Sequence, residues 1–142
     1  MGSQLKIAPY NTNLAAEFWV LSALHRLNIE ALLTLGNKKA VDILVRRGSA
    51  IYTVDVKGLA KRYDWPADNI TEFQNPNHVY ILLTFNGDIS DPLAIPSVWV
   101  IPSNKLAPFI RRYQTRSVIS RSLVINNGTE FHNNWEYLLN KV

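Results

Sequence analysis

Two apolar segments that meet at a Gly-Ser pair constrain the fold of this chain more than any other feature. Residues 38–47 read KKAVDILVRR, residues 50–57 read AIYTVDVK, and Gly48 and Ser49 lie between them. A two-residue connection that begins with glycine is typical of a type II′ turn, which joins two antiparallel strands. We therefore predict a β-hairpin whose strand register is fixed by this turn.

The hairpin register separates charged from apolar side chains. Counting outward from the turn places Asp42 directly opposite Asp55 on one face, and Lys57 shares that face one step further along. Two carboxylates about 5 Å apart repel by roughly 3 kcal/mol at an effective dielectric constant near 20, so a positive charge must compensate. The other face should pack into the core, and its side chains are Val41, Ile43, Val45, Tyr52, Val54 and Val56.

A third carboxylate enters the argument because Glu17 is the only acidic residue of the first predicted helix, residues 13–28. If Glu17 reaches the hairpin charges, three carboxylates face one lysine. A hard divalent cation resolves that imbalance, and Mg²⁺ commonly uses one or two carboxylates together with water and phosphate oxygens. The plainer alternatives are a salt-bridged hairpin rim and a Glu17 that only favours the helix dipole, with Glu30 as the substitute candidate.

An acid in an early helix, an aspartate in a VDIL strand and an acid-x-Lys triplet on the next strand resemble the PD-(D/E)XK nuclease superfamily. Its restriction-endonuclease-like fold includes archaeal Holliday-junction resolvases, and the resemblance spans residues 13–103. It implies hydrolysis of DNA phosphodiester bonds by an endonuclease of the resolvase, restriction or repair type, with Lys57 positioning or activating the attacking water. It also implies a Mg²⁺ or Mn²⁺ site formed by the catalytic acids Asp42 and Asp55, the backbone carbonyl of Val56 and, as an accessory, Glu17.

The order of the elements predicts one mixed α/β (α+β) domain over residues 1–142. The resemblance implies a three-layer, restriction-endonuclease-like architecture with a central mixed sheet of four or five strands flanked by helices. Residues 58–78 are predicted as a long loop, and the basic region 104–142 as helical. The other expected elements are a helix at 13–28 capped by Asn13 with Leu14, Phe18, Leu21, Leu24 and Leu27 buried, strands at 30–35, 79–85 and 97–103, and helices at 104–114 and 130–142.

The net charge of +4 lies in the last quarter of the chain. Residues 1–103 hold nine Lys and Arg against nine Asp and Glu, whereas residues 104–142 hold six against two. Basic side chains neutralise phosphates, and an aromatic ring stacks on bases. The alternative is an ordinary solvated surface. The side chains that we expect to bind DNA are Lys105, Arg111, Arg112, Arg116, Arg121, Arg62 and, as a stacking element, Trp65.

Several classes of protein are excluded or disfavoured. The chain has no cysteine, which removes disulfides and thiolate metal sites and is consistent with a cytoplasmic location. No apolar run is long enough for a membrane helix, so we expect no membrane partner. No glycine-rich phosphate-binding motif occurs. The alternative function is a catalytically inactive nucleic-acid-binding domain of the same fold within a larger complex, and a homodimer is an expectation at the level of the family only.

Overall fold

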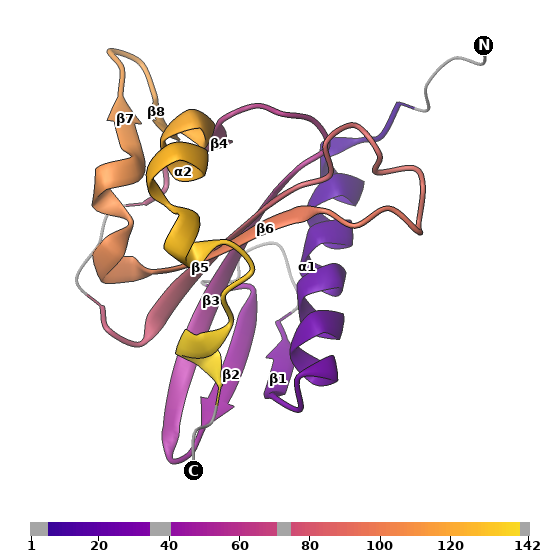
Figure 1. Cartoon of the computed structure of the whole chain (residues 1–142), viewed down its shortest axis with the longest axis vertical. Helices are drawn as coiled ribbons and strands as arrows, with labels where there is room; N and C mark the ends of the chain where they lie inside the picture. The colour runs from indigo at the N-terminus through magenta and orange to yellow at the C-terminus, as the bar shows by residue number, and fades with distance from the viewer. Residues whose placement is uncertain (1–5, 35–40, 71–74, 140–142) are drawn as a thin grey trace.

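A computed structural model describes residues 6–34, 41–70 and 75–139 of the chain (Figure 1). The predictions for residues 35, 38–40, 71–74 and 140–142 lie outside the described residues. The two helices and eight strands of the described part are α1 (Pro9–Arg26), β1 (Glu30–Leu33), β2 (Ile43–Arg47), β3 (Ala50–Leu59), β4 (Trp65–Pro66), β5 (His78–Thr84), β6 (Ser97–Pro102), β7 (Ile110–Arg112), β8 (Ser117–Ile119) and α2 (Arg121–Asn127).

The central sheet contains five strands in the order β1-β2-β3-β5-β6. Its first three strands are antiparallel, β3 and β5 are parallel, and β6 is antiparallel to β5. The mixed sheet of four or five strands and the α+β fold are therefore confirmed. None of the helices in the described ranges combines the length and apolar character that a membrane crossing needs.

The hairpin between β2 and β3 has the predicted register. Arg47 pairs with Ala50 and Ile43 with Val54, and Gly48 has a φ of 62°, the left-handed value that a type II′ turn requires at its first position. The ladder ends at Ile43, so Asp42 lies just beyond the paired residues. The local glycine therefore fixed the pairing, as expected from the sequence.

Helix α1 begins four residues before the predicted start. Pro9 occupies its first turn, where the missing N–H costs nothing, so the prediction that Asn13 caps the helix is wrong. The buried face is also different from the predicted one, since Phe18 is 53% exposed. The buried residues of α1 are Thr12, Ala16, Glu17, Val20 and Leu24.

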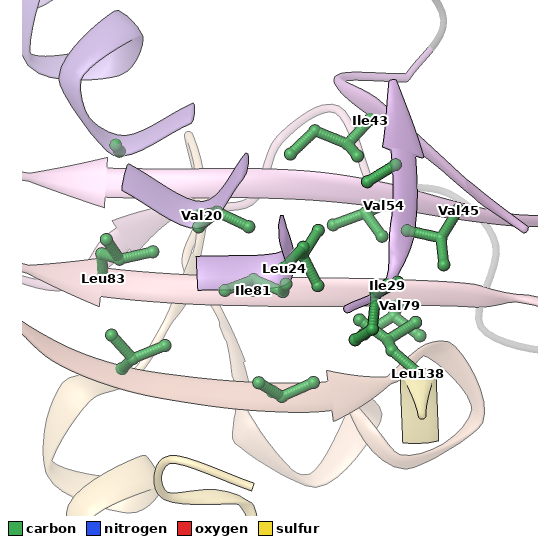
Figure 2. Close-up of a cluster of buried hydrophobic side chains, with 14 residues drawn as sticks. Val20, Leu24, Ile29, Ile43, Val45, Val54, Val79, Ile81, Leu83 and Leu138 are labelled. Carbon is green, nitrogen blue, oxygen red and sulfur yellow. The ribbon is translucent and has the colours of Figure 1, made fainter. Parts of the chain in front are cut away.

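Two hydrophobic cores lie on the two faces of the central sheet. The first joins α1 to β2, β3, β5 and β6, and most of its side chains are Val, Ile and Leu (Figure 2). The second is richer in aromatic residues and includes Trp65, Trp99, Phe109 and Phe131. It joins the other face of the sheet to β4, β8 and α2. The sheet therefore lies between a helical layer and a second, smaller layer (Figure 1).

The second layer is not the helical region that we predicted for residues 104–142. It is built on a three-stranded sheet in the order β4-β8-β7, and α2 has only seven residues. The expected helix at 104–114 is wrong because Pro108 limits the helix to short 3₁₀ turns and Ile110–Arg112 then pairs with Ser117–Ile119. The helix expected from residue 130 is also wrong: short 3₁₀ turns occupy Thr129–Phe131 and Glu136–Leu138.

Candidate functional site

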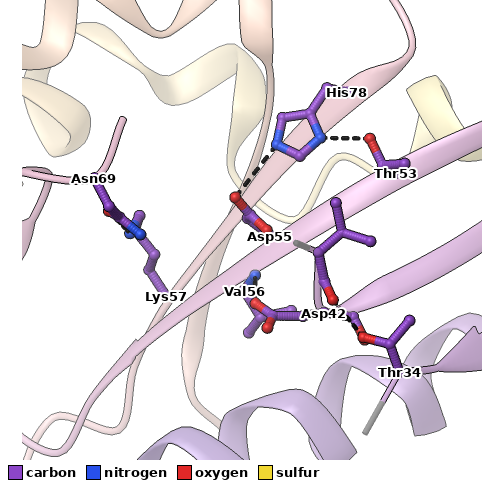
Figure 3. Close-up of polar contacts among 9 residues, drawn as sticks. Thr34, Asp42, Thr53, Asp55, Val56, Lys57, Asn69 and His78 are labelled. Atoms are coloured by element: carbon purple, nitrogen blue, oxygen red, sulfur yellow. Dashed lines mark hydrogen bonds and ion pairs between the residues drawn. The ribbon is translucent and has the colours of Figure 1, made fainter. Parts of the chain in front are cut away.

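Asp42 is held at the point where β2 ends. Its backbone N–H donates to the Val54 carbonyl (3.0 Å), and its own carbonyl accepts from the N–H and hydroxyl of Thr34 (2.9 and 3.1 Å). The Oδ2 atom of Asp42 accepts a hydrogen bond of 2.8 Å from the Val56 N–H (Figure 3). The predicted position directly opposite Asp55 is therefore replaced by a bend that carries the carboxylate to the backbone of Val56.

The backbone of Val56 lies on the edge of β3 that β2 no longer covers. The backbone N–H and C=O groups of alternate residues point to the same side of a strand. Those of Val54 and Val56 both point toward β2. Beyond Ile43, this edge faces Asp42 instead of another strand. The Val56 carbonyl and the Asp42 carboxylate are thus presented on the same edge of the sheet.

Asp55 is paired with a histidine that the sequence did not single out. The Nε2 atom of His78 lies 3.4 Å from Oδ2 of Asp55, and its Nδ1 atom lies 2.5 Å from the Thr53 hydroxyl (Figure 3). The side chain of His78 is only 12% exposed, and that of Asp55 is 26% exposed. The parallel pairing of Thr53 with His78 brings these residues together, so this contact belongs to the tertiary structure.

Lys57 completes a cluster with the two aspartates. Its Nζ atom donates to Oδ1 of Asn69 (3.2 Å). Burial lowers the pKa of Lys57, and the negative charges of Asp55, Asp42 and Asp68 oppose that shift. The charges of Asp42 and Asp55 thus act on Lys57, while its side chain extends toward Asn69 (Figure 3).

Glu17 lies on the helical side of the central sheet. It lies in the middle of α1, is 5% exposed and belongs to the helical layer. Side chains alternate along β3, so Val54 faces this layer whereas Asp55 and Lys57 face the opposite side. In residues 6–34, 41–70 and 75–139, no three His, Asp or Glu side chains are grouped so that they could hold a metal ion. The substitute candidate Glu30 is exposed and lies 3.9 Å from Arg46.

The donor atoms at the hairpin edge fit a hard divalent cation. They are the carboxylate oxygens of Asp42 and Asp55 and the backbone carbonyl of Val56. Mg²⁺ and Mn²⁺ prefer oxygen ligands, and Mg²⁺ usually needs no more than one or two carboxylates from the protein. Two acids are therefore sufficient for such an ion when water and phosphate oxygens complete the coordination.

The predicted DNA-binding residues fall into two groups. Arg111, Arg112 and Arg116 are exposed on the β7–β8 hairpin, and Lys105 is exposed in the preceding turn. Arg121 begins α2: its backbone N–H donates to Oδ1 of Asp64 (2.7 Å), and its guanidinium donates to Oδ1 of Asn86 (3.4 Å). Burial, followed by the positive charge of Arg62, lowers the pKa of Arg121, and the charge of Asp64 opposes this.

The prediction that Trp65 stacks on a base is wrong. Its side chain is fully buried, its indole N–H donates to the Leu83 carbonyl (2.9 Å), and its ring packs edge-to-face on Trp99. The apolar ring belongs to the second core because β4 pairs there with β8. Trp65 therefore has no surface to offer to a nucleic acid.

The residues that the sequence did not predict come from distant segments. His78, Asp68 and Asn69 lie 11 to 25 positions from the residues of β3 that they approach. No local spacing marks them, since the parallel β3–β5 pairing and the path of the intervening segment decide their place. The available signal was only the concentration of Asn and Asp residues in the long predicted loop.

Two solved nuclease structures are similar to this chain. The bacterial homing endonuclease I-Ssp6803I has 14% identity, with 69% of this chain and 71% of that chain covered and a TM-score of 0.47. The Holliday junction resolvase Hjc from the archaeon Archaeoglobus fulgidus has 15% identity, with 75% and 80% covered and a TM-score of 0.48. No family model and no curated protein matches the chain.

Proposed function

We propose that this protein is a divalent-metal-dependent endonuclease that hydrolyses phosphodiester bonds in DNA. In this proposal Asp42, Asp55 and the Val56 carbonyl hold Mg²⁺ or Mn²⁺, and Lys57 positions the attacking water. The basic side chains of the second layer contact the phosphates on either side. Glu17 is left out of the ligand set, because it lies in the helical layer.

One arrangement carries the proposal: the Asp42 carboxylate is bound to the Val56 N–H at the open edge of β3, and Asp55 and Lys57 share one face of the same strand. A solvated hairpin rim would leave its lysine exposed and its pKa near the ordinary value. Here Lys57 is partly buried, and its amine contacts Asn69 (3.2 Å). Perturbed titratable groups of this kind are concentrated at functional sites.

The residues suggest a division of labour for hydrolysis. A bound divalent cation would supply positive charge to the phosphate oxygens and lower the pKa of a water molecule. Asp42 is oriented by the Val56 N–H, and Asp55 by His78. Lys57, whose pKa is lowered by burial, would hold the attacking water through a hydrogen bond at its side-chain nitrogen.

The test is cleavage of plasmid, single-stranded and branched DNA with Mg²⁺ or Mn²⁺ and with a chelator. We expect cleavage only with metal, and a loss of about a hundredfold or more in Asp55→Ala and Lys57→Ala. Asp88→Ala is the matched control, because Asp88 is an exposed acid far along the chain from the site. Cleavage that survives both site substitutions would contradict the proposal.

The inactive binding domain makes a different prediction. It binds nucleic acid in a salt-sensitive manner but shows no metal-dependent turnover. Calorimetric titration with Mn²⁺ separates the two functions, since only the proposed nuclease should give heat that disappears in Asp42→Asn. That variant keeps an oxygen that can accept the Val56 N–H, so a loss of heat reports on the charge and not on the local fold.

A further inference from the structure

The β7–β8 hairpin places two arginines and a tyrosine on one face. Arg111 pairs with Val118, and beyond the strands the Tyr113 N–H donates to the Arg116 carbonyl (2.7 Å). Pairing therefore continues to the tip, and residues two apart share a face. Arg111, Tyr113 and Arg116 are consequently neighbours on one surface, while Arg112 lies on the other, where its guanidinium contacts the Ser117 hydroxyl (3.3 Å).

This surface has the composition of a nucleic-acid contact. The Tyr113 side chain is 52% exposed, and Arg111 and Arg116 are both exposed. An exposed aromatic ring between two cations offers a stacking surface for a base and partners for the phosphates beside it. The hairpin also extends away from the central sheet (Figure 1), so its tip is accessible to an extended ligand.

Strand β8 of the hairpin is anchored, at Ser117, to the segment that reaches the candidate active site. The Ser117 carbonyl accepts from the Ala67 N–H (2.9 Å), and the Ser117 N–H donates to Oδ1 of Asp68 (2.6 Å). The next residue, Asn69, accepts the hydrogen bond from Lys57. One short segment therefore holds the hairpin on one side and contacts the site on the other.

We propose that the β7–β8 hairpin is an arm that binds an unpaired stretch of the nucleic-acid substrate. Tyr113 stacks on a base, and Arg111 and Arg116 contact the flanking phosphates. The stretch is unpaired because bases within an intact duplex expose only their edges, whereas a ring needs an uncovered base face for stacking. The nucleic-acid partner rests on the proposed function, but the role of Tyr113 is tested separately from cleavage.

The experiment measures fluorescence anisotropy with a labelled single-stranded DNA and with its blunt duplex, in a chelator that prevents cleavage. Stacking on one base contributes about 1–3 kcal/mol, so Tyr113→Ala should weaken single-strand binding by about five- to 150-fold. Duplex binding should change less than about twofold, and Tyr113→Phe should bind like the wild type. Tyr10→Ala is the matched control, because Tyr10 is 69% exposed but lies on α1.

The arginines give a second readout. Replacing Arg111 and Arg116 together by Gln should reduce the slope of log affinity against log salt by about 1.4 for single strands. Unchanged single-strand affinity in Tyr113→Ala, or an equal loss of affinity for the duplex, would overturn the proposal that the hairpin binds an unpaired stretch. If Tyr113-dependent binding is found without metal-dependent cleavage, the arm stands and the nuclease proposal fails. Asp55-dependent cleavage with normal binding in Tyr113→Ala would reject the arm alone.

Discussion

At the scale of single residues, the environment of Lys57 is decided by opposing effects. Burial disfavours the ammonium form, and Asp55, Asp42 and Asp68 favour it; burial is the largest of these effects, so the pKa is lowered. The hairpin pattern placed Asp55 and Asp42 on the same face as Lys57. Asp68 and Asn69 reach it through the fold, because they follow β4, which pairs with β8 in the second layer.

Asp68→Asn should lower the pKa of Lys57 further, because it removes a charge that raises it. The asparagine keeps an oxygen that can accept the Ser117 N–H, so the hairpin remains anchored. The pKa is measured by NMR titration of labelled lysine. If Lys57 accepts a proton during catalysis, the cleavage rate rises as Lys57 loses its proton with increasing pH. In Asp68→Asn this rise should therefore occur at lower pH. Asp88→Asn should leave both values unchanged, and an upward shift in Asp68→Asn would contradict this account.

At the scale of elements, the contact between α1 and β3 depends on a missing side chain. A Cβ atom at Gly58 would lie only 2.4 Å from the Cβ of Ala16, so helix and strand approach each other more closely than two larger residues would allow. This close approach sets the height of α1 above the sheet. It explains why the buried face of α1 follows Ala16 and Val20 and leaves Phe18 exposed.

Gly58→Ala should therefore destabilise the protein by about 1–3 kcal/mol, since the helix must shift to relieve the overlap. The free energy of unfolding is measured by urea denaturation. In an Ala16→Gly background the same substitution should cost less, because the clashing methyl group is absent, although Ala16→Gly itself costs about 1 kcal/mol of helix propensity. Equal costs in both backgrounds would show that the contact does not limit the packing.

At the scale of the whole molecule, the central sheet separates a helical layer from a second layer that carries the basic hairpin. Trp65 joins the sheet to the second layer, since its indole N–H donates to Leu83 of β5 while its strand pairs with β8. Two aspartates close to it in sequence anchor the other elements of this layer. Asp64 accepts a hydrogen bond from the Arg121 N–H of α2, and Asp68 accepts one from the Ser117 N–H of the hairpin. Trp65, which we predicted to stack on a base, thus stabilises the layer that carries the basic hairpin.

Trp65→Phe should lower the free energy of unfolding by about 1–3 kcal/mol, because the Leu83 carbonyl loses a buried hydrogen bond while much of the ring packing remains. Urea denaturation measures the loss. Single-strand affinity of the folded variant should match the wild type in the anisotropy assay. If Trp65→Phe instead loses as much single-strand affinity as Tyr113→Ala at unchanged stability, Trp65 takes part in nucleic-acid binding.

Neighbouring residues alone specify several features of the fold. Gly48 specified the turn, the turn specified the register of β2 and β3, and alternation along β3 put Asp55 beside Lys57 on one face. These follow from local backbone geometry, which a short stretch of chain contains completely.

Other features depend on distant segments and follow from the tertiary structure. It put Glu17 on the opposite side of the sheet, brought His78 to Asp55, buried Trp65 and turned the predicted helix at residues 104–114 into a hairpin strand. The physical reason is that burial and pairing free energies come from contacts between segments. Such contacts override weak local preferences and leave no mark in the spacing of neighbouring residues.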